Sequence, residues 1–182
     1  MKATGIVRRI DDLGRVVIPK EIRRTLRLRE GTPLEIFTDR EGEIILKKYS
    51  PMMELTAFSG QYAEAMAQSS GLMVCITDRD QVVAVAGGPK KELLSKTISR
   101  ELERVIMERE TVQAAAGEKR FLYLVPDEVE GLYAEVVVPI ICEGDAIGSV
   151  ALFSRDQRTK MGDTELKLAQ TAAGFLGRQM ES

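Results

Sequence analysis

The sequence of 182 residues contains no histidine. Catalytic Ser-His and Cys-His pairs and histidine metal sites are therefore excluded. The G-x-x-x-x-G-K-S/T pattern of phosphate-binding loops is also absent, as are paired cysteines at metal-ligand spacing. Carboxylates are numerous, but they fall mostly in turn-like positions such as Asp78/Asp80 and Asp127/Glu128, where solvation explains them. We therefore expect a protein that is not an enzyme, with no catalytic residues and no metal.

Long hydrophobic segments are missing as well. The longest apolar run, residues 136–142, is too short to span a bilayer and is interrupted by Pro139. The first twelve residues contain no apolar segment of the kind found in secretory signals. Cys75 and Cys142 are far apart in apolar runs, so we expect reduced core cysteines rather than a disulfide or metal pair. These features predict a cytoplasmic protein with no membrane partner.

Charge is unevenly distributed along the chain. Residues 1–50 contain 12 Lys and Arg against 8 Asp and Glu, whereas residues 51–182 contain 14 against 20. A basic head on an acidic body is typical of a polyanion-binding module joined to a second domain, although an unevenly charged surface without function is the alternative. Residues 1–36 contain no aromatic side chain on which the bases of a single strand would stack. The pattern therefore favours duplex DNA as the partner.

Residues 5–28 combine short β-branched runs with arginines. Residues 5–10 and 15–18 are predicted to be strands around an acidic turn that contains Gly14. Pro19 fits the start of a helix, which we expect to continue to Leu28 before Gly31 ends it. In this helix Ile22 and Leu26 share one face, and the other face is cationic, with Lys20, Arg23, Arg24 and Arg27.

A hairpin with strands at residues 33–37 and 43–47 follows, which completes a ββαββ unit of about 50 residues. Such a small unit buries little apolar surface and is marginally stable by itself. Because the sequence offers no disulfide or metal to stabilise this unit, oligomerisation is the remaining source of stability. We therefore expect an obligate dimer, which would also pair two basic faces.

Four segments of residues 1–50 carry a family pattern: Thr4–Arg9, Asp12–Pro19, Glu21–Leu26 and Ile44–Tyr49. Together they resemble the SpoVT/AbrB-type DNA-binding domain, although the shorter pattern Gly14–Pro19 also occurs in related antitoxins. The resemblance implies a mostly-β swapped-hairpin barrel formed by a domain-swapped dimer. It also implies that basic side chains contact DNA, namely Arg8, Arg15, Arg23 and Arg24, with Arg9, Lys20 and Arg27 beside them.

Ser50-Pro51 is the expected junction between two domains, residues 1–50 and residues 51–182, because proline disfavours continuation of a strand. Hydrophobic periodicity and turn residues predict the elements of the second domain. They are a helix from Met52 that ends at Gly71, strands 72–77 and 81–86, a helix 90–110, a loop 113–119, a strand 120–125, an acidic turn 127–131, strands 132–141 and 146–154, and a final helix capped by Asp163 or Thr164.

The first and last of these helices carry apolar residues at steps of three and four. Two explanations remain open: a helical bundle between subunits, which would give a tetramer, or helices that cover the sheet of their own domain. The two stripes are Leu55, Phe58, Tyr62, Ala65 and Ser69 in the first helix, and Leu166, Ala169, Ala173, Leu176 and Met180 in the last.

Residues 138–140 and 143–152, and less closely 78–87, resemble a GAF domain. The order of elements fits the α+β fold with an antiparallel sheet flanked by helices that this resemblance implies. GAF domains often bind small molecules. We therefore expect no cofactor other than an unidentified small-molecule ligand of this domain. No ligand residue is predicted. Cys75, Tyr123, Tyr133 and Cys142 are interpreted as core, and residues 87–91 as a bare loop rather than an anion site.

The combination of both halves resembles a family of transcriptional regulators of spore-forming bacteria. It implies an activator or repressor of sporulation genes that associates with the nucleoid, in the forespore, as a homotetramer. A toxin-neutralising antitoxin is the competing interpretation. Such antitoxins usually append a short disordered tail, whereas this chain appends a second domain that we expect to fold, which counts against that class.

Overall fold

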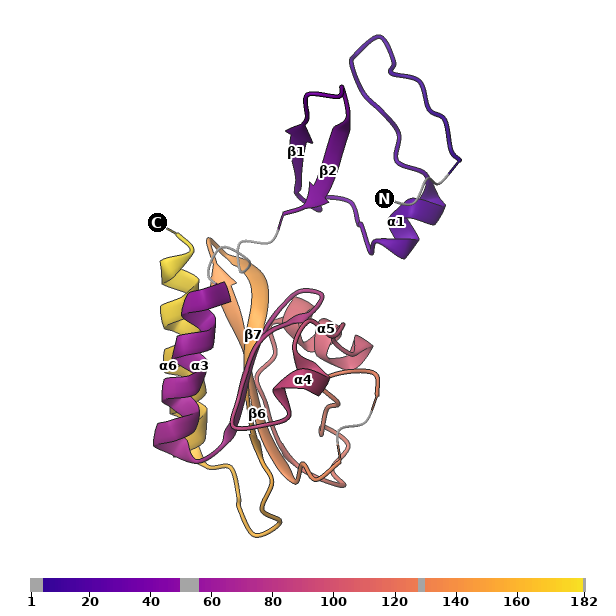
Figure 1. Cartoon of the computed structure of the whole chain (residues 1–182). Coiled ribbons are helices and arrows are strands. Elements are labelled where there is room, and N and C mark those ends of the chain that lie inside the picture. The colour runs from indigo at the N-terminus through magenta and orange to yellow at the C-terminus, as the bar shows by residue number, and fades with distance from the viewer. Residues whose placement is uncertain (1–4, 50–55, 128–129, 182) are drawn as a thin grey trace. The chain divides into compact units, whose positions relative to one another are not determined.

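The computed structural model describes residues 5–49, 56–127 and 130–181 (Figure 1). The chain divides into two compact units, Met1–Tyr49 and Ser50–Ser182. The expected junction at Ser50-Pro51, the predicted helix start at Met52 and the stripe residue Leu55 lie outside the described residues.

The N-terminal unit contains helix α1 (Lys20–Thr25) and an antiparallel hairpin of β1 (Leu34–Thr38) and β2 (Ile44–Lys48). The hairpin turn is held by the side chain of Asp39, whose Oδ1 accepts hydrogen bonds from the backbone N–H groups of Glu41 and Glu43 at 3.0 and 2.8 Å. The predicted hairpin is therefore confirmed.

Two predictions in this unit were wrong for the chain taken alone. Residues 5–10 and 15–18 are not strands: they are the irregular arms of a loop, joined by a bond of 3.0 Å from the backbone N–H of Asp11 to the carbonyl of Arg15. A strand requires a ladder of such bonds with a neighbour. Helix α1 ends at Thr25 rather than continuing toward Gly31, because Arg27 adopts a left-handed conformation with φ of 51°.

The second unit is built on one five-stranded antiparallel sheet with strand order β4-β3-β7-β6-β5. The two longest strands, β6 and β7, are joined by a tight turn, and shorter strands lie on either side of them. The strands are β3 (Met73–Asp78), β4 (Val82–Ala86), β5 (Val112–Ala115), β6 (Ala134–Cys142) and β7 (Asp145–Ser154).

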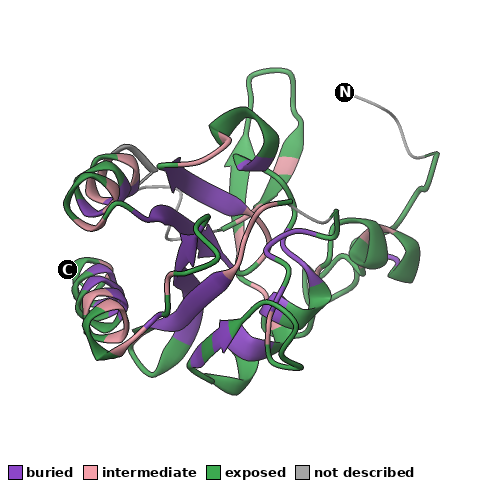
Figure 2. Ribbon diagram, turned by 90° about the horizontal axis from the view of Figure 1, so that it is seen from below, coloured by how far each residue is buried: buried purple, intermediate pink, exposed green. Residues whose placement is uncertain are grey.

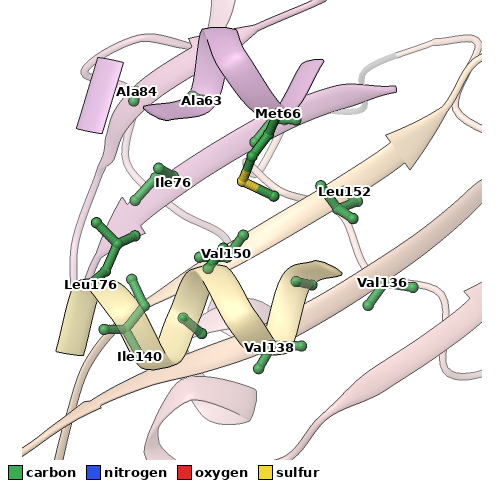
Figure 3. Packing of buried hydrophobic residues seen from close by; sticks show 14 of the residues in the cluster. Ala63, Met66, Ile76, Ala84, Val136, Val138, Ile140, Val150, Leu152 and Leu176 are labelled. Carbon is green, nitrogen blue, oxygen red and sulfur yellow. The ribbon is translucent and has the colours of Figure 1, made fainter. Parts of the chain in front are cut away.

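Helices cover both faces of this sheet. Helices α3 (Thr56–Ser70) and α6 (Asp163–Gln179) lie side by side on one face, while α4 (Lys90–Leu93) and α5 (Arg100–Glu108) lie on the other (Figure 1). Buried residues concentrate in the strands and on the inner sides of the helices (Figure 2). The cluster under α3 and α6 joins Ala63 and Met66 to Leu176 across the β-branched side chains of the sheet (Figure 3). This arrangement confirms the predicted α+β fold.

Several local predictions in this unit were wrong. The helix expected at residues 90–110 is two helices, because the chain turns at Ser95, which has a φ of 63°, and Val82 of β4 exchanges backbone hydrogen bonds with Ser95 and Lys96. The expected loop 113–119 overlaps β5, which pairs with β6, whereas the expected strand 120–125 is irregular. At the start of α6 neither Asp163 nor Thr164 is the cap. There the N–H of Gly162 donates to the Glu165 carboxylate at 2.7 Å.

The stripe predicted for the first helix was also partly wrong. Ala65 and Ser69 are exposed, and the residues of α3 that face the sheet are Ala63 and Met66. The stripe of α6 does pack on the same cluster. Both helices therefore cover the sheet of their own domain, which is one of the two alternatives above.

Candidate nucleic-acid interface

All seven basic residues expected at the interface are exposed. They belong to two neighbouring parts of the N-terminal unit. Arg8, Arg9 and Arg15 lie on the loop of residues 5–18, and the others lie on or just after α1. The set is Arg8, Arg9, Arg15, Lys20, Arg23, Arg24 and Arg27.

The loop is closed by contacts between Arg15 and Asp11. Asp11 Oδ1 accepts from the backbone N–H of Arg15 at 2.7 Å and from that of Leu13 at 3.1 Å, while Arg15 Nε donates to Asp11 Oδ2 at 2.8 Å. Hydrogen bonds from the Arg15 backbone and side chain hold the pKa of the Asp11 carboxyl group below its usual value. The carboxylate therefore fixes the turn and orients one arginine.

The remaining six basic side chains have no acidic partner among the residues that the structure describes. Helix α1 explains the arrangement of three of them, because positions 20, 23 and 24 follow the helical period on one side. The half-buried Ile22 lies on the other side. An unpaired cationic surface of this kind can bind phosphates, and an arginine fork can also pair with guanine edges.

Apolar side chains surround this cationic surface. Val7 and Val17 are 88% and 70% exposed. A small unit with so much exposed apolar area is normally covered by a partner. The other large apolar side chains exposed in this unit are Ile6, Ile10, Leu13, Val16, Leu26, Ile36, Phe37, Ile44, Leu46 and Tyr49.

Of the four residues of the second unit that the sequence analysis interpreted as core, Cys75 alone is fully buried, and Tyr133 is half-buried and lies outside any strand. Cys75 is a free core thiol, and burial raises its pKa to about 12. Cys142 is half-buried, and Tyr123 is exposed and outside any strand, so neither is a core residue. Helix α4 begins at Lys90, so residues 90 and 91 are not loop as predicted, and with only 4 residues it offers no extended helix terminus for an anion.

Glu135 was missed by the sequence analysis. It is fully buried in β6, and its Oε1 accepts from the backbone N–H of Leu122 at 2.6 Å. Burial raises its pKa to about 8, and the bond from Leu122 opposes this shift in part. A single carboxyl group in the apolar run of residues 134–142 is a signal that could have identified it.

The comparison with known families settles the class of the protein. A family model described as "Stage V sporulation protein T C-terminal, transcription factor" matches residues 54–181. A second model, described as "Antidote-toxin recognition MazE, bacterial antitoxin", matches residues 7–53. Stage V sporulation protein T of Bacillus subtilis is 56% identical over 181 residues, which is 100% of this chain and 99% of that protein. The chain belongs to the stage V sporulation protein T family of transcription factors.

The N-terminal unit has a further relative. The transition state regulatory protein AbrB of Bacillus subtilis is 64% identical to the chain over 53 residues, which is 29% of this chain and 54% of AbrB. Members of the stage V sporulation protein T family thus join an AbrB-like domain to a second domain, as the sequence predicted.

Solved structures resemble the second unit. The cofactor-binding GAF domain of the nutrient sensor CodY from Clostridium difficile has a TM-score of 0.51 and 17% identity, and the match covers 71% of this chain and 93% of that one. A type II free methionine-R-sulfoxide reductase from Thermoplasma acidophilum has a TM-score of 0.56 and 11% identity, with 72% and 95% covered. At these identities the likeness shows the fold alone, which is GAF-like. None of the described helices is long and apolar enough to cross a membrane.

Proposed function

We propose that the protein binds duplex DNA through the cationic surface of its N-terminal unit and thereby regulates sporulation genes. The observation that carries this proposal is the exposed set of seven basic side chains on the loop and on α1, six of them without an acidic partner among the described residues. Released counterions would supply much of the binding free energy. In this division residues 1–50 form the DNA-binding domain, and residues 51–182 form a GAF-like domain for sensing and assembly.

The binding-competent form is a dimer of N-terminal units in the swapped-hairpin arrangement. The exposed apolar residues of the N-terminal unit, Val7 and Val17 among them, support this assignment. In a second copy, residues 5–10 and 15–18 would find the strand partners that the single chain does not give them. Burial of these side chains would contribute roughly 1.5–3 kcal/mol each. Pairing would also double the number of cations that face one duplex.

The second domain adds a further interface and gives a tetramer. Phe58 and Tyr62 of α3 meet Phe175 of α6, with ring centroids 5.7 and 5.4 Å from that of Phe175. Phe175 is 38% exposed, so the aromatic cluster reaches the outer surface of the helix pair. Aromatic side chains of this kind are typical anchors of subunit interfaces. The domain also senses a small molecule and has no catalytic activity. The protein acts in the cytoplasm at the nucleoid, in the forespore, as an activator or repressor.

The test is fluorescence anisotropy of labelled duplex DNA with the full-length protein across a salt series. A variant with Arg8, Arg15, Arg23 and Arg24 replaced by Ala is compared after its fold and oligomeric state have been checked. We expect tight binding with a steep salt dependence for the wild type and loss of binding for the variant. Binding that does not respond to these four arginines would refute the proposed interface.

A further inference from the structure

A cavity of about 140 Å³ lies at one end of the five-stranded sheet, where β5 finishes, β6 begins and β7 finishes. Its wall is formed by residues just after β5, by residues just before β6 and by the irregular segment 121–124. Tyr133 joins the first two of these parts to the end of β7. Its carbonyl accepts from the N–H of Ala116 at 2.8 Å, and its N–H donates to the carbonyl of Ser154 at 2.9 Å.

The interior of the cavity suits an apolar body. Its wall residues Leu122 and Leu124 belong to the buried core on the α5 side of the sheet, and Phe121 and Leu132 pack against that core. Because a cavity of about 150 Å³ in another protein binds benzene, this one has room for about six non-hydrogen atoms. A single six-membered ring therefore matches the space in size.

The guanidinium group of Arg155 lies at the rim of the cavity. Its Nη2 is 3.9 Å from the position that a Cβ on the wall residue Gly131 would take. Arg155 is exposed and has no acidic partner among the residues that the structure describes. Two N–H groups of a guanidinium fit the two oxygens of a carboxylate in one plane. The rim therefore offers a site for a carboxylate beside an apolar space.

The other charged side chains near the cavity are exposed and of both signs. Among the described residues of segment 116–132 they are two cations and three anions. Arg120 is turned toward Thr111, to whose carbonyl its Nη2 donates at 3.5 Å. Water and salt screen such exposed charges, so they neither attract nor repel a ligand strongly. The five residues are Glu118, Lys119, Arg120, Asp127 and Glu130.

Glu135 lies behind the wall and is not part of it. Its Oε1 accepts from the N–H of Leu122 at 2.6 Å, and its Oε2 is buried with no hydrogen-bond partner among the described residues. Burial raises the pKa of Glu135 to about 8, so that its carboxyl group is mostly protonated at pH 7. It therefore does not repel an anion bound in the cavity.

We propose that this cavity binds a small monocarboxylate, whose carboxylate group pairs with the guanidinium of Arg155 at the rim while its compact apolar body fills the space beside Phe121 and Leu132. Because Arg155 is exposed, the ion pair keeps part of its water and avoids the desolvation cost of a buried charge. Removal of the apolar body from water supplies the rest of the affinity. The inference rests on the sensing role proposed for the second domain and names the chemistry of its ligand. It does not depend on DNA binding.

Methyl NMR of the full-length protein titrated with benzoate tests the proposal. At pH 7 and low salt we expect saturable shifts with a Kd of about 1 mM or lower. The ring current of the ligand should move the methyl signals of the wall residues Leu122, Leu124 and Leu132. Those of Leu152 and Leu176, which belong to the cluster under α3 and α6 on the other face of the sheet, should stay unchanged.

Three compounds are the matched controls. Benzamide has the shape of benzoate without its charge and should bind at least about fivefold more weakly. Benzylamine carries the opposite charge, and acetate lacks the apolar body, so neither should saturate the site at concentrations where benzoate does. Absence of saturable shifts with benzoate, or equal affinity for benzamide or acetate, would overturn the proposal.

Two arginine variants locate the carboxylate. Arg155→Gln removes the charge at the rim and should weaken benzoate binding at least about fivefold. Arg158→Gln removes the same charge three residues further along the chain, where the side chain is 91% exposed and lies 3.4 Å from Asp156, and it should leave the affinity unchanged. Equal effects of the two variants would refute the pairing with Arg155. Both positions are exposed, so both variants should fold, which circular dichroism checks. DNA affinity of the same samples without benzoate, measured in parallel, shows separately whether the regulatory function stands.

Discussion

A methyl group at Gly177 of α6 would overlap the backbone carbonyl oxygen of Ile141 in β6. Helix and strand therefore touch backbone to backbone at this point, and no side chain lies between them. Gly177→Ala should destabilise the second domain by about 1–3 kcal/mol, because either the helix or the strand must move. Urea unfolding followed by circular dichroism measures the change.

Gly174 on the same helix is the matched control. A Cβ at this position would meet no atom within 4 Å. Gly174→Ala should therefore raise stability by up to about 1 kcal/mol, since alanine loses less conformational entropy than glycine in a helix. If both variants shift the unfolding midpoint in the same direction and by the same amount, the close contact of α6 with β6 is not as described.

Stability should depend on pH through Glu135. Its pKa in the folded protein is about 8, above the ordinary value of 4.5. The folded state therefore binds a proton that the unfolded state has already lost, so the stabilisation is complete below about pH 4.5 and is lost as the pH increases to 8. The slope of the free energy of unfolding has a ceiling of about 1.4 kcal/mol per pH unit. Urea unfolding between pH 5 and pH 8 should show this decrease in the wild type and a weaker one in Glu135→Gln. Parallel curves for the two proteins would contradict the buried protonated carboxyl group.

The salt dependence of DNA binding should identify the phosphate contacts of α1. Replacing both Arg23 and Arg24 by Ala should reduce the slope of log affinity against log salt by about 1.8, or about 0.9 for each phosphate that is no longer neutralised. Anisotropy at four or more salt concentrations gives the slope. The double variant Lys90→Ala/Lys91→Ala removes two exposed cations from the second domain and should leave the slope unchanged. An equal decrease of the slope in both double variants would indicate only a general effect of net charge.

Self-association should involve two independent interfaces. Val17→Glu places a charge on the exposed apolar surface of the N-terminal unit, and Phe175→Glu places one in the aromatic cluster of α3 and α6. Each single variant should be a dimer and the double variant a monomer, in contrast to a wild-type tetramer. Sedimentation equilibrium measures these masses, with circular dichroism as a check of folding. A Val17→Glu variant that remains tetrameric would exclude dimerisation through the N-terminal surface.

The sequence allowed the two-domain organisation and both central hairpins to be predicted, because strand periodicity and glycine turns are local signals. Helix 90–110 was predicted wrongly for the opposite reason. Its apolar stripe continues through Leu94 and Ile98, but Ser95 adopts a left-handed conformation with a φ of 63°, and Ser95 and Lys96 exchange backbone hydrogen bonds with Val82 instead of continuing the helix. Strand β5 was missed because its small residues form a strand only where β6 provides the partner.

The same distinction applies to the sites. The cationic surface could be predicted because exposed charges on a short helix and a turn need only local geometry. The contact of Glu135 with Leu122 could not be predicted in this way, since the two residues meet only once a segment without regular structure folds over the sheet. Which buried polar atom lacks a partner is a property of the packed domain and not of any one segment.

Strand β6 joins two contacts that have been described separately. Glu135 near one end accepts a hydrogen bond from the backbone of Leu122, and Ile141 near the other end touches Gly177 of α6. The six steps along the chain from Glu135 to Ile141 cover about 20 Å of extended backbone in β6, which lies between β7 and β5. Because the contact with Gly177 has no flexible side chain to absorb a displacement, a shift of β6 along its axis must move α6 with it. A displacement of β6 where Glu135 meets Leu122 would therefore be transmitted to α6, the helix that carries Phe175.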